Sequence, residues 1–174
     1  MAATCRKKGF EVFDTPIENV KLPAESSDVI VSFEVIEHLF SPEGFIEQCV
    51  KFLRTSGLFI CTCPNIEALG TLVLKEKATV VDHEHVNYFS PTSISLLFAR
   101  AGLEVVEVST PGELDVDLLK KAFLSDESLQ KLNAFLSFVL LKKDEATLTD
   151  FQEFIKRAKL SSHMWIVGRK AHLE

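Results

Sequence analysis

The sequence predicts an α/β fold, with an open and mostly parallel sheet covered by helices. Apolar runs of strand length alternate along the chain with segments of helical periodicity, and this alternation is typical of such a sheet. Residues 29–33 and 58–63 form nearly continuous apolar runs, which indicate strands buried on both faces, as in parallel sheets. A chain of 174 residues is long enough for one domain with its own core.

The N-terminal part is predicted to contain a helix and then two strands. Residues 2–8 have the character of a helix end, which Gly9 closes as the C-cap. Residues 10–13 are expected to form a short strand, followed by residues that favour turns. The run at residues 29–33 is the next strand of the sheet.

A helix and a third strand follow. Ser41 is suited to the N-cap and Pro42 to the first helical position, and apolar residues then recur at mostly helical spacing. Gly57 is expected to stop this helix. The run at residues 58–63 is then a buried strand, which Pro64 breaks.

The next unit begins with a long connection, residues 64–90, in which residues 67–74 are expected to form a short helix. Connections of this length in a compact domain are usually functional or mobile. Ser90 starts a helix that Gly102 terminates. Residues 103–108 alternate apolar and acidic side chains, which predicts a strand with one exposed face.

Beyond Pro111 the pattern becomes helical, and we expect a helical insertion at residues 111–160. An apolar stripe within it indicates packing against a neighbouring helix. The insertion is predicted to contain helices at residues 115–123, 129–141 and 150–160, before a last strand at residues 164–167.

The composition argues against several classes of function. A formal net charge of −6 does not provide the basic face that binding to long nucleic acids requires. No apolar run reaches the roughly 18–20 residues that span a bilayer, and no apolar stretch of a secretory signal follows the basic N-terminus. The four cysteines are expected to be buried, reduced thiols, which indicates the cytoplasm.

Polar residues follow three of the predicted strands, at residues 14–18, 34–38 and 63–65. In open α/β sheets, ligands bind beyond the carboxyl ends of the parallel strands. We therefore expect these three segments to share one rim of the sheet and to form the functional site.

Several features occur in a characteristic order: an Asp28-led strand, an E-x-x-E-H turn at residues 34–38, a helix, a Leu-to-Gly hairpin at residues 53–57 and a strand that ends in Pro64-Asn65. This order resembles class I S-adenosylmethionine-dependent methyltransferases of the ubiquinone-biosynthesis and sugar-methyltransferase type. Two later segments are also similar to that family, DHEHVNYFSPTSISLLFARAGLEVVEV and HMWIVGRK. The resemblance implies a Rossmann-like sheet whose last strand runs antiparallel to the others.

The family's first motif, a G-x-G-x-G loop, has no counterpart among the seven glycines of this chain. In the family this loop lets the backbone approach the cofactor. We therefore expect residues 1–174 to be a single, N-terminally truncated methyltransferase domain that by itself binds S-adenosylmethionine poorly. The alternative is a degenerate, non-catalytic module for binding or dimerisation.

The resemblance implies that five residues of the first two rim segments contact S-adenosylmethionine: Asp14, Ile17, Glu18, Phe33 and Glu34. Asp14 or Glu18 would accept a hydrogen bond from the adenine amino group, and the Ile17 amide would donate one to a ring nitrogen. Residues 14–18 are equally compatible with a solvated turn.

The residues Glu34, Glu37 and His38 are three or four positions apart, which places them on one side of a helical turn. The resemblance implies two alternative roles. Together with His85 they would bind Mg²⁺ or Mn²⁺, which polarises a substrate hydroxyl. Otherwise His38 would be the general base, with Glu34 beside the methyl donor. A third alternative is a Glu–His hydrogen bond that only fixes the turn.

The implied reaction is methyl transfer to an oxygen, or less commonly a carbon, of a small molecule. Catalysis of this kind depends mostly on positioning. A truncated sheet would also leave one edge strand without a neighbour, and open edges invite pairing. We therefore expect a homodimer that forms through this edge.

Overall fold

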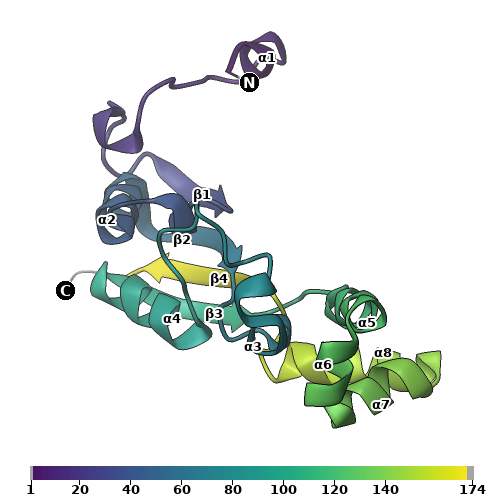
Figure 1. Cartoon of the computed structure of the whole chain (residues 1–174). Helices are drawn as coiled ribbons and strands as arrows, with labels where there is room; N and C mark the ends of the chain where they lie inside the picture. The colour runs from purple at the N-terminus through teal and green to yellow at the C-terminus, as the bar shows by residue number, and fades with distance from the viewer. Residues whose placement is uncertain (1, 172–174) are drawn as a thin grey trace.

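A computed structural model describes residues 2–171 of the chain. Its four-stranded sheet has the order β1-β2-β4-β3 (Figure 1). Strands β1 and β2 are parallel, and β4 runs antiparallel to both of its neighbours, β2 and β3. Three strands therefore point the same way and the last opposes them, which confirms the predicted sheet. The strands span Ser27–Phe33 (β1), Leu53–Pro64 (β2), Leu103–Ser109 (β3) and His163–Lys170 (β4).

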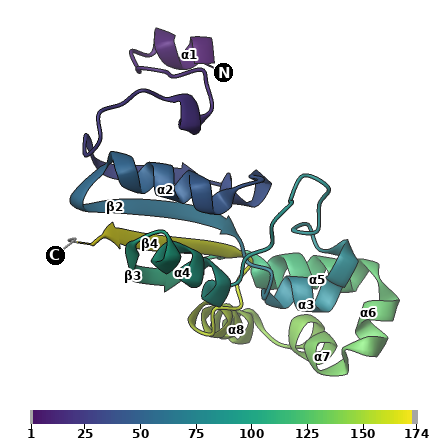
Figure 2. The same cartoon turned by 90° about the vertical axis from the view of Figure 1, so that its left-hand side faces the viewer.

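One face of the sheet is covered by two helices, α2 (Pro42–Phe52) and α4 (Pro91–Arg100), which lie on the same side in Figure 2. Fully buried residues fill this layer, and Phe59 of β2 stacks on Phe98 of α4 with ring centroids 5.3 Å apart. The cysteines of this layer are buried thiols, as predicted, and burial raises the pKa of Cys49 and Cys61 to about 12.

The opposite face of β1 is open. Val29, Val31 and Phe33 are 51%, 53% and 53% exposed, although their apolar character predicted burial on both faces. That prediction is wrong for this strand, because these three side chains are not packed against the buried core, and Phe33 is only partly covered by the Trp165 ring. The sheet therefore has one packed face and one partly solvated apolar face.

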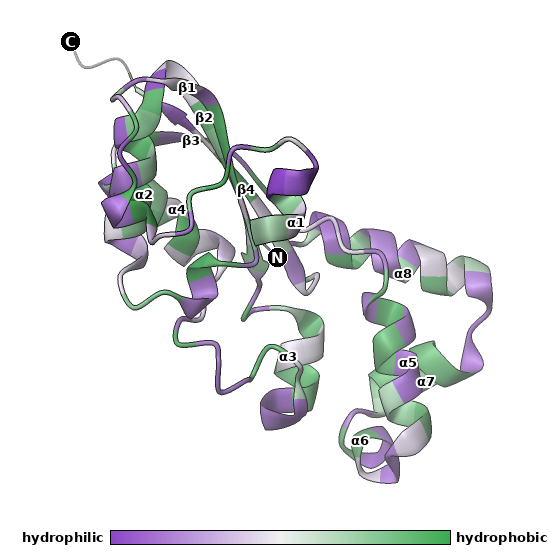
Figure 3. Ribbon diagram, turned by 90° about the horizontal axis from the view of Figure 1, so that it is seen from above, coloured by the Kyte–Doolittle hydropathy of each residue, from purple (hydrophilic) through white to green (hydrophobic). Residues whose placement is uncertain are grey.

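The helices beyond β3 form a second group at the end of the sheet (Figure 1), with its own buried cluster around Leu119, Phe123, Leu140 and Ile155. The helix α7 is mostly hydrophobic along its length (Figure 3). The four helices span Asp115–Ser125 (α5), Glu127–Leu132 (α6), Ala134–Lys142 (α7) and Glu145–Arg157 (α8).

Two helix boundaries in this group differ from the prediction. The single helix expected at residues 129–141 is interrupted at Asn133, whose extended φ of −128° separates α6 from α7. Helix α8 begins earlier than residue 150, because the Asp144 side chain accepts a hydrogen bond from the backbone N–H of Thr147 and so caps a longer helix.

The N-terminal helix α1 (Ala2–Lys7) ends as predicted at Gly9, which has φ +86°. The N–H of Phe10 donates to the Cys5 carbonyl and the N–H of Gly9 to the Arg6 carbonyl, which is the Schellman pattern. The strand predicted at residues 10–13 is wrong. This segment is irregular, because no strand within the described residues lies beside it to complete a hydrogen-bonded ladder.

The boundary between α2 and β2 also differs from the prediction. Helix α2 ends at Phe52 and β2 begins at Leu53, so Gly57 lies inside the strand instead of stopping the helix. A Cβ at Gly57 would lie only 2.8 Å from the Arg54 carbonyl oxygen and 3.0 Å from that of Asp28. The glycine is therefore needed for close backbone approach.

Two short elements lie between β2 and α4: the predicted short helix, α3 (Leu69–Leu74), and a 3₁₀ turn at Lys75–Lys77. The start of α4 is also as predicted, since Ser90 and Ser93 form a reciprocal capping box. Gly102 follows that helix with φ +85°. None of the helices between residues 2 and 171 has the length and apolarity needed to cross a bilayer.

Candidate active site

The residue that follows β1 is Glu34, and it has an unusual backbone conformation. Its φ of +51° lies in the left-handed region, which is uncommon for a residue other than glycine. The Glu34 N–H donates to the Thr62 carbonyl at 3.1 Å, and the Thr62 hydroxyl donates to Glu34 Oε1 at 2.7 Å. Strand β2 thus fixes both the backbone and the carboxylate of Glu34 at the rim.

Two residues of β4 complete this part of the rim. The Nδ1 atom of His163 lies 3.6 Å from Glu34 Oε1. The ring of Trp165 stacks on Phe33 with centroids 6.2 Å apart. Thr62 of β2 is buried and pairs with Phe33 on one side and with Trp165 on the other. The ends of β1 and β4 therefore bring a carboxylate, an imidazole and two aromatic rings together at the rim.

A second cluster is formed by Glu37 and His38, in the 3₁₀ turn Ile36–His38, and by His85. One ligand atom from each residue lies within 4.8 Å of the others, and the two imidazole centroids are 4.8 Å apart. Glu34, which was predicted to join these three as a ligand, is not part of the cluster, because its carboxylate is turned to Thr62 and His163.

Backbone carbonyls fix the tautomers of both imidazoles. His38 Nδ1 lies 2.9 Å from the Glu84 carbonyl oxygen, and His85 Nδ1 lies 2.7 Å from that of Val80. Because a carbonyl oxygen only accepts hydrogen bonds, both Nδ1 atoms carry the hydrogen, and both Nε2 atoms keep their lone pair when the rings are neutral.

The carboxylate of Glu37 is buried, with 2% of the residue exposed, and its Oε2 atom has no hydrogen-bond partner. Burial raises the pKa of Glu37 above its usual value, against a smaller lowering by a backbone hydrogen bond. A buried carboxylate oxygen without a partner is costly unless another group satisfies it.

The long connection brings His85 to this turn. The backbone N–H groups of Val86 and Asn87 both donate to the Glu37 carbonyl at 3.0 Å, and Asn87 Nδ2 donates to the Leu39 carbonyl at 2.6 Å. His83, the other histidine of this loop, is exposed and pairs with Asp82, so it lies outside the cluster.

A cavity of about 440 Å³ opens beside His38. Ile17 and Glu18 line it from a 3₁₀ turn (Ile17–Asn19), and Val35, His38 and other residues line it from the segment after β1. The structure therefore brings together two segments that the sequence placed on one rim. It does not bring Asp14 to the cavity: this residue is exposed and lies 3.9 Å from the guanidinium group of Arg6.

The third predicted rim segment is mainly structural. Asn65 is completely buried, and its Nδ2 atom donates to the carbonyls of Lys159 and Ser161, both at 3.0 Å. Its Oδ1 atom accepts a hydrogen bond from the Glu67 N–H at 3.1 Å. Asn65 thus connects the end of β2 to the start of β4 and is not available to a ligand.

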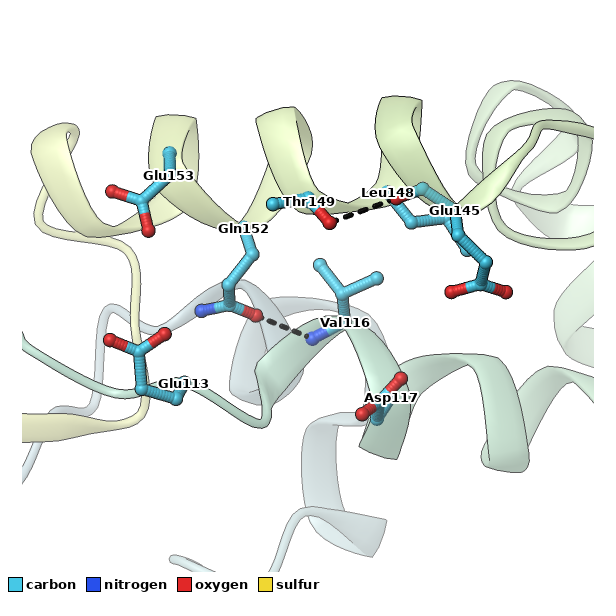
Figure 4. Close-up of a pocket in the computed structure, with 8 residues that line it drawn as sticks. All are labelled: Glu113, Val116, Asp117, Glu145, Leu148, Thr149, Gln152 and Glu153. Carbon is cyan, nitrogen blue, oxygen red and sulfur yellow. Dashed lines mark hydrogen bonds between the residues drawn. The ribbon is translucent and has the colours of Figure 1, made fainter.

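A different cavity, of about 210 Å³, lies between α5 and α8 (Figure 4). Its acidic lining is partly neutralised, because Lys156 Nζ lies 2.6 Å from Glu113 and 2.9 Å from Glu153, and Lys120 Nζ lies 3.0 Å from Glu145. Gln152 Oε1 accepts a hydrogen bond from the Val116 N–H at 2.9 Å (Figure 4). These contacts hold the helices together and do not converge on a reacting group.

The sequence did not identify Thr62 or His163 as site residues. Thr62 is the polar residue inside the apolar run of β2, directly before the rim, and that position was an available signal. His163 could not be assigned from local pattern, because its contact with Glu34 depends on the pairing of β4 with β2.

Comparison with known proteins gives a consistent result. Residues 3–108 match a family described as a methyltransferase domain. A probable S-adenosylmethionine-dependent methyltransferase of Mycobacterium tuberculosis (strain ATCC 25618 / H37Rv) is 42% identical over 55 residues, which cover 32% of this chain and 20% of that protein. The human mitochondrial ubiquinone biosynthesis O-methyltransferase is 31% identical over 121 residues, which cover 61% of this chain and 33% of that protein.

This chain thus spans between a fifth and a third of the length of these two relatives. A crystal structure from Thermotoga maritima, described as an S-adenosylmethionine-dependent methyltransferase and possible histamine N-methyltransferase, has the same fold. It superimposes with a TM-score of 0.58 and 19% identity, over 98% of this chain and 69% of that one. The names of the curated relatives do not favour the alternative of a non-catalytic module.

Proposed function

This chain belongs to the methyltransferase domain family of class I S-adenosylmethionine-dependent enzymes, and from that premise we propose that it methylates an oxygen atom of a small molecule. The observation that carries the proposal is the cavity of about 440 Å³ where Ile17 and Glu18 meet the turn after β1. It is the place where the rim of the sheet has both a wall of apolar side chains and groups that accept protons.

The adenine side of the proposed cofactor site is the turn Ile17–Asn19. The Ile17 N–H is the first amide of this turn, and such amides lack a partner within the helix. It would donate to a ring nitrogen, while the Glu18 carboxylate would accept from the amino group. Phe33 and Glu34 would face the rest of the methyl donor from the end of β1. Asp14 has no part in this proposal, because it lies away from the cavity.

The acceptor side is the part of the rim at His38, which lines the cavity and is clustered with Glu37 and His85. A hydroxyl that attacks a methyl group must lose its proton, and neutral imidazoles suit that task near pH 7. The chain's contribution is therefore to orient the hydroxyl and to take up its proton.

We further propose that Glu37, His38 and His85 hold a divalent cation. One ligand atom from each of these residues lies within 4.8 Å of the others, and Glu37 Oε2 is buried without a hydrogen-bond partner. Each imidazole donates its Nδ1–H to a backbone carbonyl, as metal-bound histidines do. Carboxylate and imidazole ligands together suit Mn²⁺ better than Mg²⁺. An ion in this position would polarise the acceptor hydroxyl.

The proposal is tested by titrating S-adenosylhomocysteine, and adenosine as a fragment, into the ¹⁵N-labelled chain. We expect saturable amide shifts at Ile17, Glu18 and His38, and little or no thermal stabilisation, because the chain contains no G-x-G-x-G loop. Glu145→Gln, in the cavity between α5 and α8, is the matched control and should leave these shifts unchanged. A titration without shifts at the rim would favour the non-catalytic alternative.

A further inference from the structure

Another cavity, of about 180 Å³, lies between α3 and α5 and shares no lining residue with the cavity beside His38. The two helices form two of its walls, and residues 78–80 of the long connection form a third. Its surface is mainly apolar and includes Leu74, Ala78, Val80, Leu118 and Leu119. Leu118 is 55% exposed, so a small molecule can enter from solvent on the side of α5.

The polar groups of this lining suit an uncharged ligand. Asp115 is buried, and its carboxylate already accepts hydrogen bonds from the Ser162 N–H at 2.7 Å and from the Gln152 side chain at 3.1 Å. A carboxylate whose hydrogen bonds are satisfied repels an anion and needs no cation. Thr71 and Thr79 contribute hydroxyl groups to the lining, which can serve at most a few hydrogen bonds of a neutral ligand.

The size of the cavity corresponds to one ring, since an apolar cavity of about 150 Å³ binds benzene. Part of this space is open because residue 70 of α3 is a glycine. A Cβ at Gly70 would meet no heavy atom within 4 Å, and its φ does not lie in the left-handed region. Neither crowding nor backbone geometry therefore requires a glycine here, although glycine destabilises a helix relative to alanine.

The cavity adjoins the imidazole cluster through a single residue. Val80 lines the cavity, and its carbonyl oxygen lies 2.7 Å from His85 Nδ1. The same segment is anchored farther back by Lys77, whose Nζ lies 2.9 Å from the Asp126 carboxylate at the start of α6. A ligand that displaces Val80 therefore changes the hydrogen bond that orients the His85 ring.

We propose that this cavity binds a compact, uncharged and mostly apolar group about the size of one aromatic ring, and that its occupant controls the orientation of His85 through Val80. The contacts are van der Waals contacts with the apolar walls, and no covalent step is involved. Binding here needs neither the methyl donor nor a cation, so the site goes beyond the proposed methyl transfer and does not depend on it.

The first test is a titration of toluene into the whole chain with ¹³C-labelled leucine and valine methyl groups. We expect saturable shifts of the methyl signals of Leu74, Val80 and Leu118, and none with benzoate, which adds a charge to the same ring. Gly70→Leu should abolish the toluene shifts, because the new side chain extends into the open space. Leu72→Ala, at an exposed position of α3 outside the cavity lining, should leave them unchanged.

Gly70→Ala provides a second variant in case the larger side chain disturbs folding. The added methyl group should raise the Kd for toluene, while thermal unfolding should show no loss of stability, because alanine favours the helix. An absence of toluene shifts in the parent chain, or an unchanged Kd in the folded Gly70 variants, would overturn the proposed site.

The second test measures the coupling through the ring ¹⁵N shifts of His85, which are assigned from their loss in His85→Ala. Toluene should move these shifts and leave those of the exposed His83 in place, because His83 lies outside the cluster. Toluene binding without any change at His85 would overturn the proposed control of the imidazole. Neither test uses S-adenosylhomocysteine, so failure here is distinguishable from failure of the proposed function.

Discussion

The carboxylate of Glu37 and the imidazole of His38 lie 3.8 Å apart, measured from Oε1 to Nε2, while Glu37 Oε2 is buried without a partner. Folding therefore places a charge-bearing group where water does not reach it, directly beside two imidazoles. Groups that cost stability in this way are characteristic of functional sites.

We expect Glu37→Gln to stabilise the chain by about 1 kcal/mol at pH 7. The pKa of Glu37 is raised by burial, so the folded state binds more protons than the unfolded state. Stability then falls as the pH rises from the unfolded pKa, about 4.3, toward the raised folded pKa. Urea denaturation of both proteins at pH 4 and pH 7 measures this. The gain should be larger at pH 7, and an equal gain at both pH values would contradict the explanation.

A divalent cation is expected to bind at the cluster of Glu37, His38 and His85. Because Mn²⁺ is paramagnetic, its addition should broaden the side-chain NMR signals of His38 and His85 before those of His163. His85→Ala should abolish this selective broadening, and His83→Ala should not, because His83 lies outside the cluster. Broadening of all exposed histidines alike would count against a site.

Asp115 is predicted to be the main polar anchor between the helices and the sheet. Although burial alone would raise its pKa, hydrogen bonds from Ser161, Ser162 and Gln152 hold that pKa below its usual value. We expect Asp115→Ala to cost about 2–4 kcal/mol of unfolding free energy, since buried donors lose their partner.

The same anchor should depend on pH. Because the folded pKa is lowered, the stabilisation is fully present above the unfolded pKa, about 3.9, and is lost as the pH falls through the folded value. The difference between the parent chain and Asp115→Ala should therefore shrink below pH 4 in chemical denaturation. Asp117→Ala, at an exposed position two residues away, should change stability by less than about 0.5 kcal/mol.

Self-association is expected at the open edge of the sheet. Strand β1 is paired on one side only, and its Val29, Val31 and Phe33 side chains are half-exposed. A second copy of the chain could pair with this edge and cover them. Light scattering should show mass increasing with concentration, and Val31→Lys should suppress the increase. Leu96→Lys, on the exposed surface of α4, should leave it intact, and a monomer at all concentrations would rule the edge contact out.

Features governed by local rules were predictable from the sequence. Gly9 and Gly102 end their helices with positive φ, and Ser90 caps α4, because these positions depend on a few neighbouring residues. The strand at residues 10–13 was mispredicted because a strand depends on a distant partner and not on local rules. A strand exists only with a partner, and its own residues do not specify whether one is present.

The candidate site shows the same division. The spacing within the E-x-x-E-H turn placed Glu37 and His38 side by side, and the turn is local. The position of His85 depends on Val86 and Asn87 binding the Glu37 carbonyl across the long connection. The separation of Glu34 from that cluster follows from its contacts with β2 and β4, which depend on the register of the whole sheet.

The most direct test of the central claim is ultraviolet cross-linking of S-adenosylmethionine, labelled in its methyl group, to the intact chain, followed by peptide mapping. Cross-linking captures weak binding, so it suits a chain without a glycine-rich loop. We predict label in the peptides that contain Ile17 and Glu18 or residues 33–38, with displacement by excess S-adenosylhomocysteine. Label confined to the helices α5–α8, or label that S-adenosylhomocysteine does not displace, would contradict the assignment of the rim as the methyl-donor site.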